Sequence, residues 1–288
     1  MKLYKYRSTS KFSLEGLINN ELYFSKYTDF NDPFEFSTPF PDLVKTYKKA
    51  EEKFVEYYAN KEIPKEVYLE LINLVKTPSE DVIKKRFDTL SEIKNNTQKM
   101  GIFCMSKTDE NILMWSHYAE EHKGFCIEFN ELNKHLLDKA DLIDVNYLDN
   151  FEDLNNPDLI VDFFMLMFWD YRDLPRSEWE RKYIELAQNL KMYEEYKLAL
   201  SIIGNKYVDW SYEKEVRLVT CNNGVIKYDP QSIISITFGL RMSESDKATI
   251  RNICKTDDKC HIKFKQAEKL ISGYGLKNIY LKTDPERA

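Results

Sequence analysis

The stretch Trp210-Ser211-Tyr212-Glu213-Lys214-Glu215-Val216-Arg217-Leu218-Val219 places charged residues where the interior of a strand is expected. In an extended chain side chains alternate between two faces. The apolar face carries Val216 and Leu218, and the charged face carries Glu213, Glu215 and Arg217. Neighbouring carboxylates oppose each other's ionisation unless a cation compensates, and such groups concentrate at functional sites. The alternative is an exposed edge strand whose charges prevent aggregation.

Composition predicts a folded protein of a reducing compartment. With 288 residues the chain can bury a substantial core. Its five cysteines are scattered without CxxC spacing, which predicts neither a disulfide framework nor a zinc site and favours the cytoplasm. The N-terminus has no apolar signal region, and the apolar run 163–169 is too short to span a bilayer, so we expect no membrane partner. The net charge of -6 argues against a surface dominated by nucleic-acid binding.

Strand-like and helix-like segments follow one another along the whole chain. Apolar runs predict strands at 3–7, 21–25, 101–106, 124–129, 141–147, 213–221, 233–238, 261–265 and 279–283. Short helices are expected at 10–19, 109–118 and 243–254. Longer helical segments are expected at 41–99, interrupted at Pro64 and Pro78, and at 158–203, with 163–169 as its buried centre.

This order of segments predicts an α+β fold. We expect one domain over residues 1–288, with a central mixed or mainly antiparallel sheet and helical insertions at about 41–99 and 158–203. A doubly wound dinucleotide-binding fold is not expected, because no glycine-rich turn joins a strand to a helix.

Four short clusters have residue types that suit a ligand with phosphates and a cationic ring. They are residues 4–8, 30–36, 106–118, and 213–217 followed by Arg241. Arginines such as Arg7, Arg217 and Arg241 would hold phosphates, and aromatic rings would stack on the ligand's rings. A hydroxyl would orient a ribose, and carboxylates would stabilise developing positive charge.

Each cluster also has a structural interpretation. Arg7 would then be a surface cation, and Asn31-Asp32-Pro33 an Asx turn that fixes a loop. Trp115 and Tyr118 are spaced at i and i+3, which is common for core residues. His117 would be a hydrogen-bonded structural histidine, because no second metal ligand stands at a diagnostic spacing from it.

The motifs resemble a bacterial family called domain of unknown function 2971. The resemblance rests on Leu-Tyr-Lys-Tyr-Arg at 3–7, Phe-Asn-Asp-Pro-Phe at 30–34 and Cys-Met-Ser at 104–106. It continues with Met-Trp-Ser-His-Tyr-Ala at 114–119 and Trp-x-Tyr-Glu-Lys-Glu-Val-Arg-Leu at 210–218, so that it spans nearly the whole chain. The family name itself implies no activity.

A second, weaker resemblance is to mono-ADP-ribosyltransferases, which carry an arginine on the first strand, then a strand with a serine, then Glu-x-Glu. Arg7, the strand end Phe-Cys-Met-Ser at 103–106, and Glu-Lys-Glu at 213–215 follow this order. The resemblance implies an ADP-ribosyltransferase-like fold with NAD as the substrate. It also implies transfer to a protein or nucleic-acid acceptor, or NAD hydrolysis, by a bacterial toxin or antiviral defence effector.

The resemblance assigns a role to each candidate residue. Glu215 would stabilise the oxocarbenium-like ribose, and Glu213 would deprotonate or orient the acceptor. Arg7 would hold the diphosphate or the ribose edge, and Ser106 would brace the first strand or a ribose hydroxyl. The other cofactor-binding candidates stack a ring or line the mouth of the site: Trp115, His117, Tyr118, Asn31, Asp32, Arg217 and Arg241.

Two other classes of function are compatible with the sequence. One is a metal-dependent phosphodiesterase or nuclease, with Asp32, Glu128, Glu213 and Glu215 as oxygen ligands for Mg²⁺. The other is a non-catalytic module that binds a nucleotide or a protein through the polar strand face.

Overall fold

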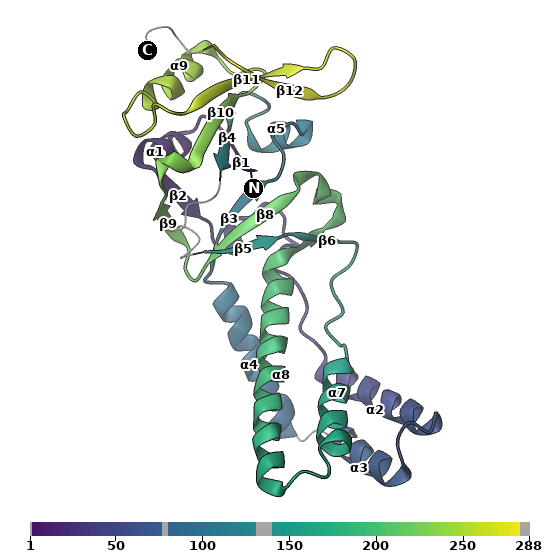
Figure 1. Cartoon of the computed structure of the whole chain (residues 1–288). Coiled ribbons are helices and arrows are strands. Elements are labelled where there is room, and N and C mark those ends of the chain that lie inside the picture. Colours follow the sequence, from purple (N-terminus) through teal and green to yellow (C-terminus); the bar gives the residue numbers. More distant parts are fainter. Residues whose placement is uncertain (1, 77–79, 131–139, 283–288) are drawn as a thin grey trace. The chain divides into compact units, whose positions relative to one another are not determined.

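A computed structural model describes residues 2–76, 80–130 and 140–282, and the chain divides into two compact units (Figure 1). Unit 1 comprises Met1–Phe34, Gln98–Asp149 and Lys206–Ala288. Unit 2 comprises Glu35–Thr97 and Asn150–Asn205, so the two predicted helical insertions come together in one unit. Each unit has a hydrophobic core of its own. That the whole chain acts as a single domain stays a prediction.

The described part of unit 1 is built on an eight-stranded sheet in the order β12-β11-β10-β4-β1-β3-β8-β5. Neighbouring strands are antiparallel except β10 and β11, which confirms a large mixed sheet and the α+β class. The strands are β1 (Lys2–Arg7), β3 (Gly101–Ser106), β4 (Phe125–Asn130), β5 (Asp141–Asp144), β8 (Glu215–Thr220), β10 (Ile233–Phe238), β11 (Lys263–Lys269) and β12 (Leu276–Tyr280). Two small ladders join β2 (Glu21–Phe24) to β9 (Gly224–Lys227) and β6 (Asn146–Leu148) to β7 (Asn205–Tyr207).

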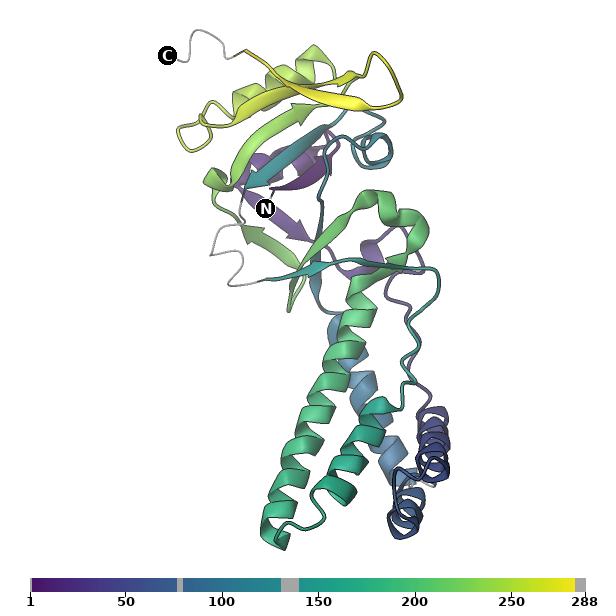
Figure 2. The ribbon, with the colours of Figure 1, turned by 45° about the vertical axis from the view of Figure 1, so that its right-hand side comes forward.

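The large sheet consists of two groups of strands that meet at one residue pair. β1 pairs with β4 along its whole length, and β3 pairs with β8 along its whole length. Between β1 and β3, by contrast, the described residues pair only where Tyr4 faces Ser106. Figure 2 shows the two groups, β12-β11-β10-β4-β1 and β3-β8-β5. The sheet is therefore split between β1 and β3, the fifth and sixth strands in its order.

Helices pack on both faces of the sheet. Apolar side chains of one face, such as Phe125 and Phe238, form a core with Leu17 of α1 (Lys11–Asn19) and Ile250 of α9 (Glu244–Ile253). The other face packs against α5 (Ile112–Tyr118) in a smaller cluster around Tyr6, Trp115 and Cys126. The described part of the unit also contains the 3₁₀ turns η1 (Tyr27–Asp29), η3 (Val208–Glu213) and η4 (Pro230–Ser232).

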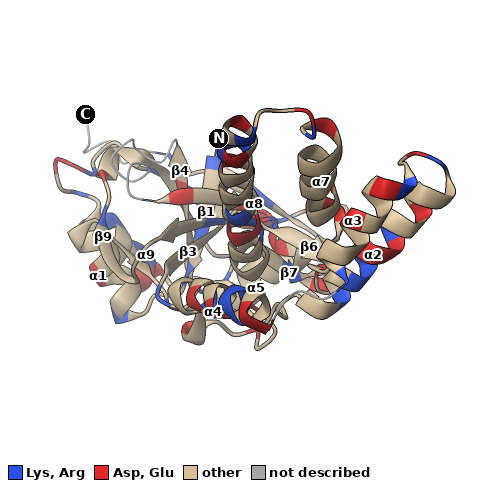
Figure 3. Ribbon diagram, turned by 90° about the horizontal axis from the view of Figure 1, so that it is seen from below, with Lys and Arg blue, Asp and Glu red and all other residues tan. Residues whose placement is uncertain are grey.

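Unit 2 is helical. Its elements are α2 (Leu43–Ala59), α3 (Lys65–Val75), α4 (Glu80–Thr97), α7 (Asp158–Met165), the π-helical turn η2 (Leu166–Asp170) and α8 (Arg176–Gly204). The core combines Phe54 of α2, Leu71 of α3 and Val161 of α7. Acidic and basic residues both occur along α2 and α4 (Figure 3). Among the described residues, none of the helices combines the length and the apolar character needed to cross a membrane.

Several predicted elements are confirmed and others need correction. The helices expected from residues 10 and 243 are present, and Ser10 and Ser243 cap α1 and α9, because each hydroxyl accepts from a main-chain N–H of the first turn. The segment 158–203 is not one continuous helix, and within 163–169 only Met167 is fully buried. The expected strand 141–147 is two strands, and the ladder of β9 was not predicted. The break expected at Pro64 is present, whereas Pro78 and Thr283 lie outside the described residues.

Candidate functional site

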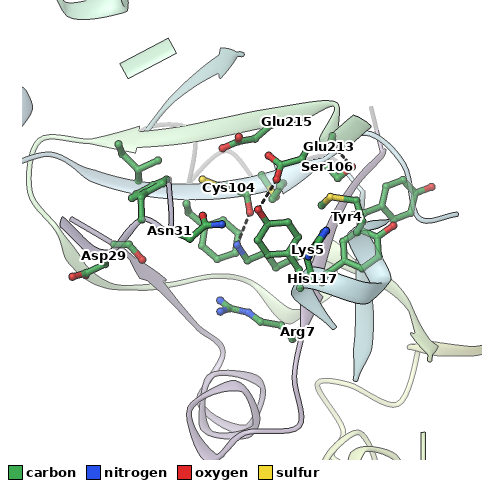
Figure 4. A pocket seen from close by; sticks show the side chains of 18 of the residues that line it. Tyr4, Lys5, Arg7, Asp29, Asn31, Cys104, Ser106, His117, Glu213 and Glu215 are labelled. Atoms are coloured by element: carbon green, nitrogen blue, oxygen red, sulfur yellow. Dashed lines mark hydrogen bonds between the residues drawn. The ribbon is translucent and has the colours of Figure 1, made fainter. Parts of the chain in front are cut away.

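A cavity of about 390 Å³ lies in unit 1, where β1 and β3 separate. We call it the split pocket. It is lined by side chains of β1, β3, α5 and η1 and of the segment leading into β8, among them Lys5, Arg7, Ser106, Tyr118, Glu213 and Glu215. Its volume lies in the range of small-molecule sites. Figure 4 shows Glu213 and Glu215 on one side of the pocket and Arg7 on the other, with Lys5 between them.

Glu215 is a buried carboxylate held by two cations. It is the first residue of β8, which lies between β3 and β5, and it is 5% exposed. Arg217 Nε donates to Glu215 Oε1 at 2.8 Å, and Lys206 Nζ donates to Oε2 at 3.0 Å. Burial raises the pKa of Glu215, but the charges of Arg217 and Lys206 outweigh burial and leave it well below its usual range. The carboxylate is therefore ionised at neutral pH, and the edge-strand alternative is wrong.

Glu213 lies before the strand, not in it, because Lys214 takes the left-handed conformation at a φ of 45° and ends η3. The expected strand 213–221 therefore begins at Glu215. Lys206 Nζ donates to Glu213 Oε2 at 2.6 Å, and the Tyr118 hydroxyl donates to Oε1 at 2.5 Å. Burial raises the pKa of Glu213 despite these partners. The two carboxylates thus differ, and Glu213 is the one suited to proton exchange.

Ser106 fixes Glu213 through the main chain. Its hydroxyl donates to the Glu213 carbonyl at 2.6 Å and accepts from the Thr108 N–H at 3.1 Å. It also stands in register with Tyr4 on β1 and with Glu215 on β8. The Ser106 side chain is fully buried, so its role in the structure is to brace the strands around the pocket.

Lys5 and Arg7 bring positive charge to the split pocket. The Lys5 ammonium lies 4.5 Å and the Arg7 guanidinium 5.6 Å from the centre of the Phe103 ring. Lys5 Nζ donates to the Cys104 carbonyl at 2.6 Å. Within the described residues, neither side chain forms an ion pair. Burial lowers the pKa of both groups. The surface-cation interpretation of Arg7 is therefore wrong.

The structure brings some of the other candidates to the pocket. Asn31, His117 and Tyr118 line it, although Asn31 and His117 are largely exposed to solvent. The Asx-turn interpretation holds for Asp32, whose carboxylate accepts from the Phe34 N–H at 2.9 Å.

The remaining candidates lie outside the pocket lining. Trp115 is a core residue, because its ring packs edge-on against Tyr6 and its Nε1 donates to the Asp109 carbonyl. Arg217 is fully buried and donates a hydrogen bond to the Glu215 carboxylate. Arg241 lies on an exposed turn after β10. A direct ligand-binding role for Asp32, Trp115, Arg217 and Arg241 therefore finds no support in the geometry.

Two important residues were not predicted. Lys206, in the three-residue strand β7, bridges Glu213 and Glu215 but has no local pattern that marks it. Lys5 did have a signal, because it lies two residues from Arg7 on the same face of a strand.

The four carboxylates that a metal-dependent mechanism requires do not come together. Glu128 binds Lys265 Nζ at 2.5 Å and Lys2 Nζ at 2.6 Å, away from the pocket lining, and Asp32 is used in its turn. The Lys206 ammonium is bound by both Glu213 and Glu215, and it takes the place that a metal ion shared by these two carboxylates would need. In the described part of the chain, no group of three or more His, Cys, Asp or Glu residues is arranged to hold a metal ion.

The comparisons with known proteins give one match. Residues 114–218 match the family described as "Protein of unknown function (DUF2971)". No curated protein and no solved structure matches the chain. The matched segment includes α5 from Met114 onward, and also Lys206, Glu213 and Glu215, which line the split pocket. This match supports, over residues 114–218, the resemblance to the DUF2971 family that the motifs predict.

Proposed function

We propose that the chain is an NAD-dependent ADP-ribosyltransferase-like enzyme that cleaves the bond between nicotinamide and ribose in the split pocket. The observation that carries the proposal is the order of strands. Arg7, Ser106 and Glu215 belong to the adjacent strands β1, β3 and β8, and all three line one cavity. This is the arginine, serine, glutamate order of the mono-ADP-ribosyltransferases, and we propose a fold of that class for unit 1.

The two carboxylates suit the two steps of such a reaction. Loss of nicotinamide builds positive charge on the ribose, and a fixed carboxylate stabilises charge that appears only in the transition state. Glu215 has the lowered pKa for this role, and Lys206 and Arg217 fix its orientation while offsetting part of its charge. Glu213, with its raised pKa, would take a proton from the acceptor hydroxyl or amine.

The cations suit the other end of NAD. Arg7 has a planar guanidinium that matches phosphate oxygens, and the described residues offer it no carboxylate. We infer that Arg7 holds the diphosphate. The acceptor would be a protein or a nucleic acid, or water if the reaction is hydrolysis. A toxin or defence effector in a bacterial cytoplasm is the biological role that this chemistry suits.

Release of nicotinamide from NAD tests the proposal. Glu215→Gln keeps the shape of the side chain and removes its charge, so we expect release to fall about 10²- to 10³-fold. Glu128→Gln is the matched control: Glu128 is as buried as Glu215 and is also bound by lysines, but it lies outside the pocket lining. The control should keep its activity.

Four results would count against the proposal or refine it. No nicotinamide release by the unmodified protein, with acceptors of both classes present, would overturn it. Release unchanged in Glu215→Gln would remove Glu215 from the mechanism. Activity abolished by EDTA would favour the metal-dependent alternative. NAD binding without turnover would favour the non-catalytic binding module. Such a module would also be consistent with the ion pairs of Glu213 and Glu215 and with the absence of ion pairs at Lys5 and Arg7 among the described residues.

A further inference from the structure

Lys5, which is half-buried, differs from the buried lysines of unit 1. Lys206 is bound by Glu213 and Glu215, and Lys265 is bound by Glu128 at 2.5 Å. Lys5 Nζ meets only a carbonyl oxygen and the face of an aromatic ring among the described residues. It nevertheless lines the split pocket, so a ligand in the pocket would reach it.

The groups that face Lys5 come from four elements. Arg7 stands two residues away on β1, Cys104 lies on β3, and Glu213 and Glu215 end η3 and begin β8. Burial and the charge of Arg7 lower the pKa of Lys5 to about 8, while the two carboxylates act in the opposite sense. Roughly a quarter of such an amine is uncharged at pH 7.5, against about a thousandth for an ordinary lysine.

We propose that Lys5 is a nucleophilic amine that forms an imine with a small aldehyde carrying a phosphate group, and that Arg7 holds the phosphate. Desolvation and a neighbouring cation are the two conditions that activate lysine as a nucleophile, and both are present. Arg7 stands on the same face of β1 as Lys5, and both cations lie over the Phe103 ring. The phosphate and the reacting amine would therefore be neighbours.

The step balances without any oxidant. The uncharged Nζ attacks the carbonyl carbon and gives a carbinolamine. The hydroxyl then leaves with a proton from the nitrogen as water, and the carbon–nitrogen double bond forms. The hydrogen bond from Nζ to the Cys104 carbonyl does not prevent attack, because an uncharged amine donates one hydrogen and keeps its lone pair. This chemistry does not depend on NAD cleavage, and loss of that activity would leave it untouched.

Pyridoxal 5′-phosphate is a suitable probe because it is both an aldehyde and a phosphate monoester. The protein is incubated with a small excess of the probe, reduced with borohydride to fix the imine as a secondary amine, and mapped by peptide mass spectrometry. We expect Lys5 to be labelled first, with a pH midpoint near 8. Lys206 lines the same cavity but is bound by two carboxylates, so it should stay unlabelled. Exposed Lys2 should react only at higher pH.

Two variants test separately the role of Lys5 as the reacting amine and the role of Arg7 as the phosphate-binding group. Lys5→Arg keeps the positive charge and should abolish the labelling at this position. Arg7→Met should weaken the binding of pyridoxal 5′-phosphate at least 10-fold and move the midpoint of Lys5 labelling to higher pH, because a neighbouring positive charge is gone. The affinity for pyridoxal, which lacks the phosphate, should change little in this variant.

The unmodified protein alone can overturn the proposal, so it does not depend on the folding of the variants. Labelling of Lys5 no faster than that of Lys2, or a midpoint near that of a free lysine, would show an ordinary amine. Equal loss of affinity for pyridoxal and its phosphate in Arg7→Met would show that Arg7 does not hold the phosphate.

Discussion

Replacing Lys206 by methionine should destabilise unit 1, and by more at alkaline than at acidic pH. The lysine is 7% exposed and is the shared counterion of Glu213 and Glu215. Methionine keeps most of the aliphatic stem and removes the charge. Breaking a buried ion pair by removing one partner costs about 3–5 kcal/mol, because the remaining charge stays buried without compensation.

The pH dependence follows from the pKa of Glu213. Its pKa is already above the ordinary value of 4.5, so the folded state binds this proton more tightly than the unfolded state. Stability therefore falls as pH rises from the unfolded pKa to the folded pKa. Without Lys206 the folded pKa rises further, and each additional pKa unit adds about 1.4 kcal/mol to the loss above that range. We therefore expect a larger deficit at pH 8 than at pH 5, because a larger fraction of Glu213 is protonated at the lower pH.

Urea unfolding measures this difference. With Trp169 and Trp179, both in unit 2, replaced by phenylalanine, the fluorescence comes from Trp115 and Trp210 of unit 1. The double variant Lys206→Met/Glu213→Gln should recover most of the loss at pH 8, because it removes one charge of each sign. A deficit below about 1 kcal/mol, the usual value of an exposed pair, or a deficit equal at both pH values would refute the reasoning.

Three further substitutions test the frame of the pocket. Ser106→Ala leaves the Glu213 carbonyl without its donor and should lower the free energy of unfolding by about 1–3 kcal/mol, measured by urea unfolding. Tyr118→Phe removes a hydrogen bond that lowers the pKa of Glu213, so this pKa should rise further. A ¹³C carboxyl NMR titration measures it, and a lowered pKa would contradict the assigned contact. Gly124→Ala would place a Cβ 2.1 Å from the Arg7 carbonyl oxygen, and the forced backbone shift should destabilise unit 1 by about 1–3 kcal/mol or more. An unchanged free energy of urea unfolding would show that the end of β1 is free to move.

Local sequence signals predicted most elements of the sheet. The runs at 101–106 and 233–238 became β3 and β10 without a change of bounds, because each fits a strand buried on both faces. The helices expected from residues 10 and 243 are present, with Ser10 and Ser243 as their caps. These features depend on residues close together in the chain, which is why the sequence reveals them.

The predictions that failed concern features that depend on tertiary structure. A non-glycine residue in the left-handed conformation, Lys214, moved the start of β8 by two residues and separated Glu213 from the strand. The spacing of Trp115 and Tyr118 could not show that one ring enters the core while the other reaches the pocket. Lys206 is invisible to pattern reasoning because its partners lie seven and nine residues away across a turn.

The split in the sheet links these observations, because a split leaves main-chain groups that need other partners. Antiparallel strands satisfy carbonyl groups with each other's N–H groups, yet the described parts of β1 and β3 pair at one position. A buried carbonyl without a donor costs about 1–3 kcal/mol, and Lys5 supplies the donor for Cys104. Lys5 thus brings a positive charge to the gap between β1 and β3. Glu213 and Glu215 are already matched by Lys206 and Arg217. Lys5 and Arg7 together then exceed the single charge of Asp29, which also lines the split pocket, so the pocket favours an anionic ligand.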